Sequence, residues 1–181
     1  MVAPEDWHES AARLAGAPSA RARCRRRGAE LDRGRAHRDQ RHAIAPGVAH
    51  LAEQGVTHVV NCRPRAPVLW SGDLAAERAA FGPGRVTHAP MQDHGRRQRP
   101  ATWAAAACFA ARVLDDQPQA HVLIHCSAGR RRSAMLAYAV LRLRGHDQTQ
   151  AVGLVLRYRP QAQLVPAYVR SVERWLATAA R

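Results

Sequence analysis

A cysteine at the end of an apolar stretch is the residue in this sequence best placed to do chemistry. Cys126 directly follows His125, and Arg132 comes six positions after the cysteine. A thiolate is a strong nucleophile, and the planar guanidinium of arginine can hold two oxygens of one phosphoryl group. The spacing alone is weak evidence because arginine is frequent here, but His125, Gly129 and Ser133 at their positions make the pattern specific.

The segment between the cysteine and the arginine is short enough to curl around an anion. Its members are Ser127, Ala128, Gly129, Arg130 and Arg131. Backbone N–H groups of such a loop, at the start of a helix, form a cradle for a phosphate, and Gly129 permits the tight curl. We expect the cradle and Arg132 to lower the pKa of Cys126 below the ordinary value of about 8.5.

Two neighbours of the loop have supporting roles in this interpretation. The Ser133 hydroxyl can donate to the sulfur of Cys126 when that sulfur becomes a leaving group, or it can serve only as a helix N-cap. His125 is expected to orient the loop through hydrogen bonds rather than to exchange protons.

The elements that must position these residues alternate along the chain. Strands are predicted at 56–61, 85–89 and 121–125, and helices at 45–54, 73–80, 103–114, 133–144, 147–158 and 165–179. Thr102 is the expected N-cap of the helix at 103–114, and Arg63-Pro64 is expected to open a loop. The pattern predicts an α/β domain with a helical C-terminal half and a site at the carboxyl ends of its strands.

Length and composition set the organisation of the chain. With 181 residues it is long enough for one domain, which we place at 42–181, after an Arg-rich and poorly ordered segment at 1–41. The net charge is +14, but all basic side chains besides histidine are arginines and none is lysine, which indicates compositional bias rather than a nucleic-acid partner.

Cysteine usage and hydropathy indicate the compartment. The four cysteines, at 24, 62, 108 and 126, form no C-x-x-C pair and no framework typical of small secreted domains. No apolar run approaches about 20 residues, so no membrane span is expected. The sequence therefore predicts a cytoplasmic protein in a reducing compartment.

His-Cys-Ser-Ala-Gly-Arg-Arg-Arg-Ser at 125–133 resembles the phosphate-binding loop of dual-specificity phosphatases, a branch of the protein tyrosine phosphatase superfamily. Gly-Val-Thr-His-Val-Val-Asn at 55–61 and Arg157-Tyr-Arg-Pro160 extend the resemblance over about residues 44–176. It implies that family's fold, with a central, mostly parallel sheet flanked by helices. It also implies a bacterial-type, cysteine-dependent hydrolase of phosphate monoesters that needs no metal or cofactor.

The same resemblance assigns a general acid. Asp93, in Ala-Pro-Met-Gln-Asp-His, matches the aspartate that protonates the leaving oxygen and later activates water. Asp115 and Asp116 fit less well, because they end a helix. The expected substrate is a phosphorylated protein. A phosphoinositide or inositol phosphate is the alternative, since Arg130 and Arg131 supply partners for further phosphates, although compositional bias explains them equally.

Cys62 carries a separate hypothesis. If the strand at 56–61 lies parallel to the strand at 121–125, both thiols emerge at one edge, and Cys62 could form a reversible disulfide that protects Cys126 from overoxidation. Related lipid phosphatases look similar here. The alternative is that Cys62 is a small buried apolar residue.

Other classes of function explain only parts of the sequence. An Arg-rich nucleic-acid binder has support from the cluster at 21–27 but lacks a base-reading module. A phosphatase fold that only captures phosphorylated partners conflicts with the joint presence of Cys126, Arg132 and Asp93. A sulfur-transferase loop would be shorter, and a zinc site from His125, Cys126 and Cys62 is disfavoured because adjacent residues do not easily bind one metal ion.

Overall fold

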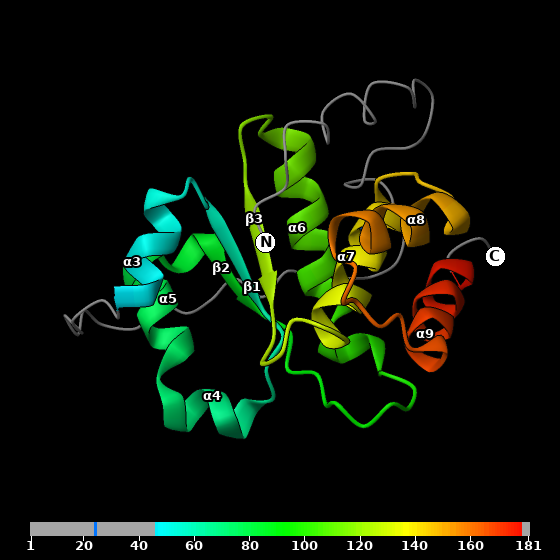
Figure 1. Ribbon diagram of the computed structural model, residues 1–181, viewed down its shortest axis with the longest axis horizontal. Helices are drawn as coiled ribbons and strands as arrows, with labels where there is room; N and C mark the ends of the chain where they lie inside the picture. Colours follow the sequence, from blue (N-terminus) through cyan, green and yellow to red (C-terminus); the bar gives the residue numbers. More distant parts are fainter. Residues whose placement is uncertain (1–23, 25–45, 179–181) are drawn as a thin grey trace.

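A three-stranded parallel sheet lies at the centre of the computed structural model, which describes Cys24 and residues 46–178 (Figure 1). Its strands are β1 (His58–Asn61), β2 (Val86–His88) and β3 (Val122–His125), in the order β2-β1-β3. In the middle strand, Asn61 lies opposite His88 on one side and His125 on the other. The predicted α/β class with a parallel sheet is therefore confirmed.

Helices cover both faces of this sheet. They are α3 (Pro46–Glu53), α4 (Arg65–Ser71), α5 (Asp73–Phe81), α6 (Ala104–Asp116), α7 (Arg132–Leu143), α8 (Gln148–Tyr158) and α9 (Pro166–Ala177), with short 3₁₀ turns at Pro83–Arg85 and Pro100–Thr102. α3 and α5 lie on one side of the sheet and α6 and α7 on the other, with α8 and α9 packed outside α7 (Figure 1). No helix in the described part of the chain is long and apolar enough to cross a membrane.

The middle strand, β1, contributes one valine to each of two apolar cores, one on each face of the sheet. Val59 packs with Phe81 and Val86 in a small core beneath α3 and α5. Val60 belongs to the larger core between the sheet and the C-terminal helices. Successive side chains of a strand point to opposite faces, so β1 is buried throughout, as a strand covered on both sides must be.

Two local predictions were wrong. The segment after Pro64 forms α4 rather than a loop, and Pro67 is tolerated there because it lies in the first turn, where backbone N–H groups have no partner within the helix. Thr102 does not cap α6. Its hydroxyl donates to the carbonyl of Arg99, and Trp103 holds the N-cap position without a side-chain bond.

Cys24 is the one described residue before Pro46, and it forms a disulfide with Cys108 on α6. The cysteine spacing indicated no disulfide framework, and this pair corrects that expectation; its members lie 84 positions apart, so no local pattern links them. The rest of the segment predicted to be poorly ordered, and the domain boundary at 42, lie outside the described residues. A cross-link that closes so long a loop restricts the unfolded chain strongly, by about 4.6 kcal/mol in the chain-entropy model.

A polar network connects α9 to α7. Arg142 donates to both carboxylate oxygens of Glu173, from Nε at 2.8 Å and from Nη2 at 2.9 Å, and the Tyr138 hydroxyl donates to the same carboxylate. Burial raises the pKa of Glu173, but the hydrogen bonds from Arg142 and Tyr138 outweigh it and hold the pKa below its ordinary value. The network fixes α9 against α7, the helix that begins at Arg132.

Replacing this carboxylate tests the network. Glu173→Gln should lower the free energy of unfolding at pH 7 by about 2 kcal/mol, the loss expected for charged hydrogen bonds. The folded-state pKa is lowered, so the stabilisation is complete above the ordinary glutamate pKa and disappears as pH falls through the folded value. In urea unfolding, the difference between variant and wild type should therefore shrink from pH 7 to pH 3.

Glu53→Gln is the matched control, because Glu53 lies on α3 with 76% of its side chain exposed. It should change the unfolding free energy little at either pH. A loss in Glu173→Gln that is equally large at both pH values would contradict the charged network.

Candidate active site

Two cysteines emerge side by side at the carboxyl edge of the sheet. Cys62 and Cys126 directly follow β1 and β3, which pair in parallel so that Asn61 lies opposite His125. The backbone N–H of Cys62 extends the pairing by donating to the carbonyl of His125 at 2.7 Å. Sequence analysis placed both thiols at one edge, and the structure brings them there.

The segment after Cys126 turns back on itself before α7 begins at Arg132. Gly129 has a φ of +64°, a left-handed conformation that side chains rarely adopt. A Cβ at this position would also lie 2.9 Å from the guanidinium of Arg159. The side chain of Arg159 is flexible and can give way, so the backbone conformation is the stronger reason for glycine here.

The sulfur of Cys126 receives several hydrogen bonds. The Ser133 hydroxyl lies 3.5 Å from Sγ, and the backbone N–H groups of Gly129 and Ser133 also point at the thiol. Burial raises the pKa of Cys126, but these hydrogen bonds together with the positive charge of Arg132 outweigh it, so the pKa lies below its ordinary value. Ser133 lies within α7, next to the sulfur, and the N-cap position of this helix belongs to Arg131 rather than to Ser133.

Arg132 lies beneath the loop and is only 4% exposed. Its Nη2 donates to the Ser127 hydroxyl at 3.3 Å, and its Nη1 donates to the carbonyl of Cys62 at 3.5 Å. Its Nε is buried and has no hydrogen-bond partner within the described residues. The guanidinium is thus held from two elements and keeps donor capacity for an anion.

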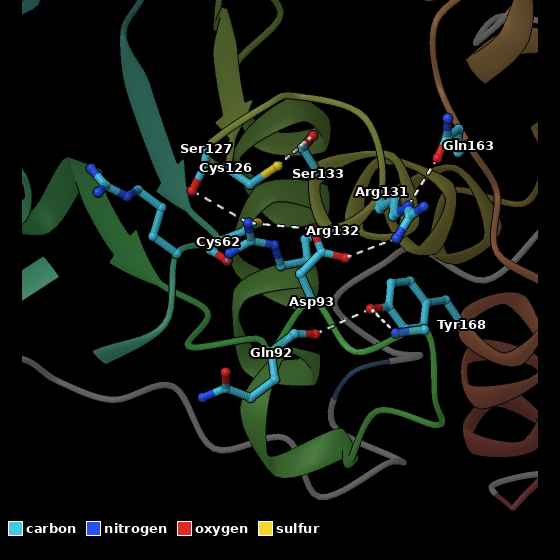
Figure 2. A network of polar contacts seen from close by, with 12 residues as sticks. Cys62, Gln92, Asp93, Cys126, Ser127, Arg131, Arg132, Ser133, Gln163 and Tyr168 are labelled. Carbon is cyan, nitrogen blue, oxygen red and sulfur yellow. Dashed lines mark hydrogen bonds and ion pairs between the residues drawn. The ribbon is translucent and has the colours of Figure 1, made fainter. Parts of the chain in front are cut away.

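Asp93 reaches this site from the loop between β2 and α6. One carboxylate oxygen lies 3.6 Å from Nη2 of Arg132, and the other lies 3.8 Å from Nη1 of Arg131. Its side chain remains 37% exposed, and its carboxylate points toward Arg131 and Arg132 (Figure 2). The structure therefore brings together the sequence-predicted nucleophile, arginine and acid. Asp115 instead forms an ion pair with Arg144 at the end of α6.

His125 lies beside a buried carboxylate that the sequence analysis missed. Nε2 of His125 lies 2.8 Å from Glu77, and the Asn61 amide donates to both oxygens of the same carboxylate at 3.1 and 3.2 Å. The signal was present in the sequence. On α5, Glu77 shares one face with the apolar residues Leu74 and Phe81, where a carboxylate needs polar partners.

The segment after α8 supports the other side of the loop. The side chain of Gln163 accepts a hydrogen bond from Nε of Arg131 at 2.8 Å, and its backbone N–H donates to the carbonyl of Arg130 at 2.8 Å. Arg131 therefore bridges Gln163 and Asp93, whereas the Arg130 side chain is exposed. No motif in the sequence pointed to Gln163.

Cys62 is fully buried beside this site. Burial raises the pKa of its thiol, and the nearby Cys126 raises it further. The two thiols thus differ in character, because the environment of Cys126 favours the thiolate and that of Cys62 favours the neutral thiol. A disulfide between them stays a prediction.

Removing the Ser133 hydroxyl should raise the pKa of Cys126, because the thiolate loses a donor. We expect the pH midpoint of Cys126 alkylation by iodoacetamide to move upward in Ser133→Ala, with a several-fold slower reaction at pH 6. Mass spectrometry of the tryptic peptide 113–130 isolates this cysteine from the others. Ser133→Thr keeps a hydroxyl and should stay near the wild-type midpoint. An unchanged midpoint in Ser133→Ala would show that this hydroxyl does not stabilise the thiolate.

Comparison with known proteins places this architecture. No protein-family model and no curated protein sequence matches the chain. Solved structures do. PTPMT1 in complex with PI(5)P is similar with a TM-score of 0.60 and 15% identity, over 76% of this chain and 88% of that one. Human DUSP28 is similar with a TM-score of 0.55 and 21% identity, over 72% of this chain and 84% of that one.

A third similar structure is Tk-PTP in its active form, with a TM-score of 0.58 and 20% identity, over 75% of this chain and 88% of that one. At these identities the likeness concerns the fold. The sheet, the strand-to-helix loop and the helical C-terminal half described above are the features in question. The chain therefore has the fold shared by dual-specificity and tyrosine phosphatases, as its loop sequence predicted.

Proposed function

We propose that this protein hydrolyses phosphate monoesters through a phosphocysteine intermediate. The thiolate of Cys126 attacks phosphorus, and the bond between phosphorus and the leaving oxygen breaks. Arg132 and the backbone N–H groups of the loop bind the phosphoryl oxygens during the transfer. The observation that carries the proposal is geometric: the Ser133 hydroxyl lies 3.5 Å from the sulfur of Cys126, and the buried Arg132 lies at the end of the same loop, 3.6 Å from Asp93.

Asp93 donates a proton in the first step of the reaction and accepts one in the second. In the first step its protonated carboxyl gives a proton to the leaving oxygen, and in the second its carboxylate takes a proton from the attacking water. Cys126 then leaves as a thiolate, stabilised by Ser133, and inorganic phosphate is released. The position of Asp93 near Nη2 of Arg132 supports this role, because Arg132 is also the group that would hold the phosphoryl oxygens.

The proposed substrate is a phosphorylated protein side chain, with an inositol phosphate or phosphoinositide as the second candidate. Arg130 favours the second candidate, because its exposed charge follows the cradle and could meet a further phosphate. PTPMT1, which shares the fold, was solved with PI(5)P. Arg131 contributes less to this argument, since Gln163 and Asp93 already engage its guanidinium.

The nucleophile is tested by hydrolysis of para-nitrophenyl phosphate. Wild type should turn over in the presence of a chelator and be inhibited by orthovanadate, whereas Cys126→Ser should lose at least roughly 1,000-fold in kcat because a neutral hydroxyl replaces the thiolate. Circular dichroism should show that the variant is folded. Retained turnover in Cys126→Ser would refute the mechanism.

The acid is tested by the leaving group. Asp93→Asn should lower kcat on phenyl phosphate by roughly 100-fold and kcat on para-nitrophenyl phosphate much less, because the poorer leaving group depends more on the proton. Asp116→Asn, at the end of α6, is the matched control and should keep the wild-type kcat on both substrates. An equal loss on the two substrates in Asp93→Asn would assign the acid to another group.

A further inference from the structure

The loop that carries Asp93 has little regular structure of its own. It runs from the end of β2 at His88 to the 3₁₀ turn at Pro100–Thr102, and Gln92, Asp93 and His94 are exposed. Its backbone nevertheless meets α9, more than 70 positions later in the chain. Among the described residues, side-chain hydrogen bonds join this loop to α9, and the ion pair of Asp93 with Arg132 joins it to α7.

Tyr168 makes two of the contacts and encloses Asp93 between them. Its hydroxyl donates to the carbonyl of Gln92 at 3.1 Å and accepts from the backbone N–H of Gly95 at 3.2 Å. Gln92 directly precedes Asp93 in the chain, and Gly95 follows Asp93 two positions later. The tyrosine itself is fully buried, so its hydroxyl is at a fixed position (Figure 2).

Ser171, one turn further along α9, binds the end of the loop. Its hydroxyl accepts from the backbone N–H of Gln98 at 3.0 Å and donates to the carbonyl of Ala167 at 2.7 Å. Gln98 then closes the loop on itself, since its amide donates to the carbonyl of Gln92 at 2.6 Å. Ser171 and Gln98 are each 3% exposed, so water does not compete freely for these bonds.

The helix that makes these bonds, α9, is itself fixed to α7. Glu173 binds Arg142 on α7, the helix that starts at Arg132. On the other side, Trp175 packs edge-on against Trp103, with ring centroids 5.1 Å apart. The acid loop and the phosphate loop are therefore positioned by one pair of helices.

We propose that Tyr168, together with Ser171, is a positioning residue for the general acid. Their hydroxyls hold the loop closed on α9, with Asp93 beside Arg132, before any substrate arrives. This inference rests on the proposed function, because it concerns how the acid is presented to the leaving oxygen. It assigns a role in the reaction to residues that form no part of the phosphate-binding motif.

Tyr168→Phe removes the hydroxyl and keeps the buried ring. We expect kcat on phenyl phosphate, whose leaving oxygen needs a proton, to fall by roughly tenfold. That factor corresponds to the free energy of about one hydrogen bond. KM should change little, because Arg132 and the cradle are intact. With para-nitrophenyl phosphate, a better leaving group, kcat should change less than roughly twofold.

Two controls separate positioning from general damage. Tyr158→Phe makes the same change at the tyrosine that ends α8, outside both the acid loop and α9. It should not alter the ratio of the two substrates. In an Asp93→Asn background, Tyr168→Phe should have no further effect on kcat, because the group that it positions is gone. An additive loss would overturn the proposal.

Hydrogen exchange tests, independently of catalysis, whether Tyr168 and Ser171 hold the acid loop on α9. Backbone amides at Gly95 and Gln98 should be protected in wild type, and Tyr168→Phe should exchange faster at 92–98 while peptides from α6 and α7 stay unchanged. If wild type hydrolyses no phosphate monoester, the proposed function fails, but this exchange still decides whether the loop is held. Unchanged exchange at 92–98 in Tyr168→Phe would overturn the proposed positioning role of Tyr168, whatever the activity.

Discussion

The buried positive charge of Arg132 is the constraint on which the rest of the site depends. A guanidinium that is only 4% exposed is costly unless its donors find acceptors and its charge finds a partner. The end of β1 supplies the carbonyl of Cys62, the phosphate loop supplies Ser127, and the acid loop supplies Asp93. Three segments far apart in the sequence thus converge on one side chain, and its position favours an anion above it.

The fold was largely predictable from local patterns. The apolar strands and the helices with clear start and stop signals were confirmed, because each is specified by residues within its own segment. α4 was missed because Arg63-Pro64 resembles a loop opening, and the formation of that helix depends on packing of Val68 rather than on a strong local signal. The Cys24–Cys108 pair was missed for a related reason, since no local feature connects residues so distant in sequence.

The residues of the site also fall into two groups, those that local spacing predicts and those that only the folded chain brings together. Cys126, Gly129 and Arg132 were found because their chemistry depends on spacing within one loop, and the structure places them together. The residues that position them, such as Glu77 and Tyr168, come from other elements. Glu77 could have been found from its place on an apolar helix face, but Tyr168 on α9 also fits an ordinary core residue, and only the folded chain shows where its hydroxyl points.

The disulfide between Cys24 and Cys108 changes the covalent topology of the chain. It closes a ring that contains β1, β2 and Asp93, and it leaves Cys126 and α7 on the linear remainder. A single backbone cut anywhere inside the ring therefore yields two pieces that remain one molecule until the bridge is reduced. When the cut falls between Asp93 and Cys108, the acid and the nucleophile lie on different pieces, and the disulfide keeps those two pieces in one molecule.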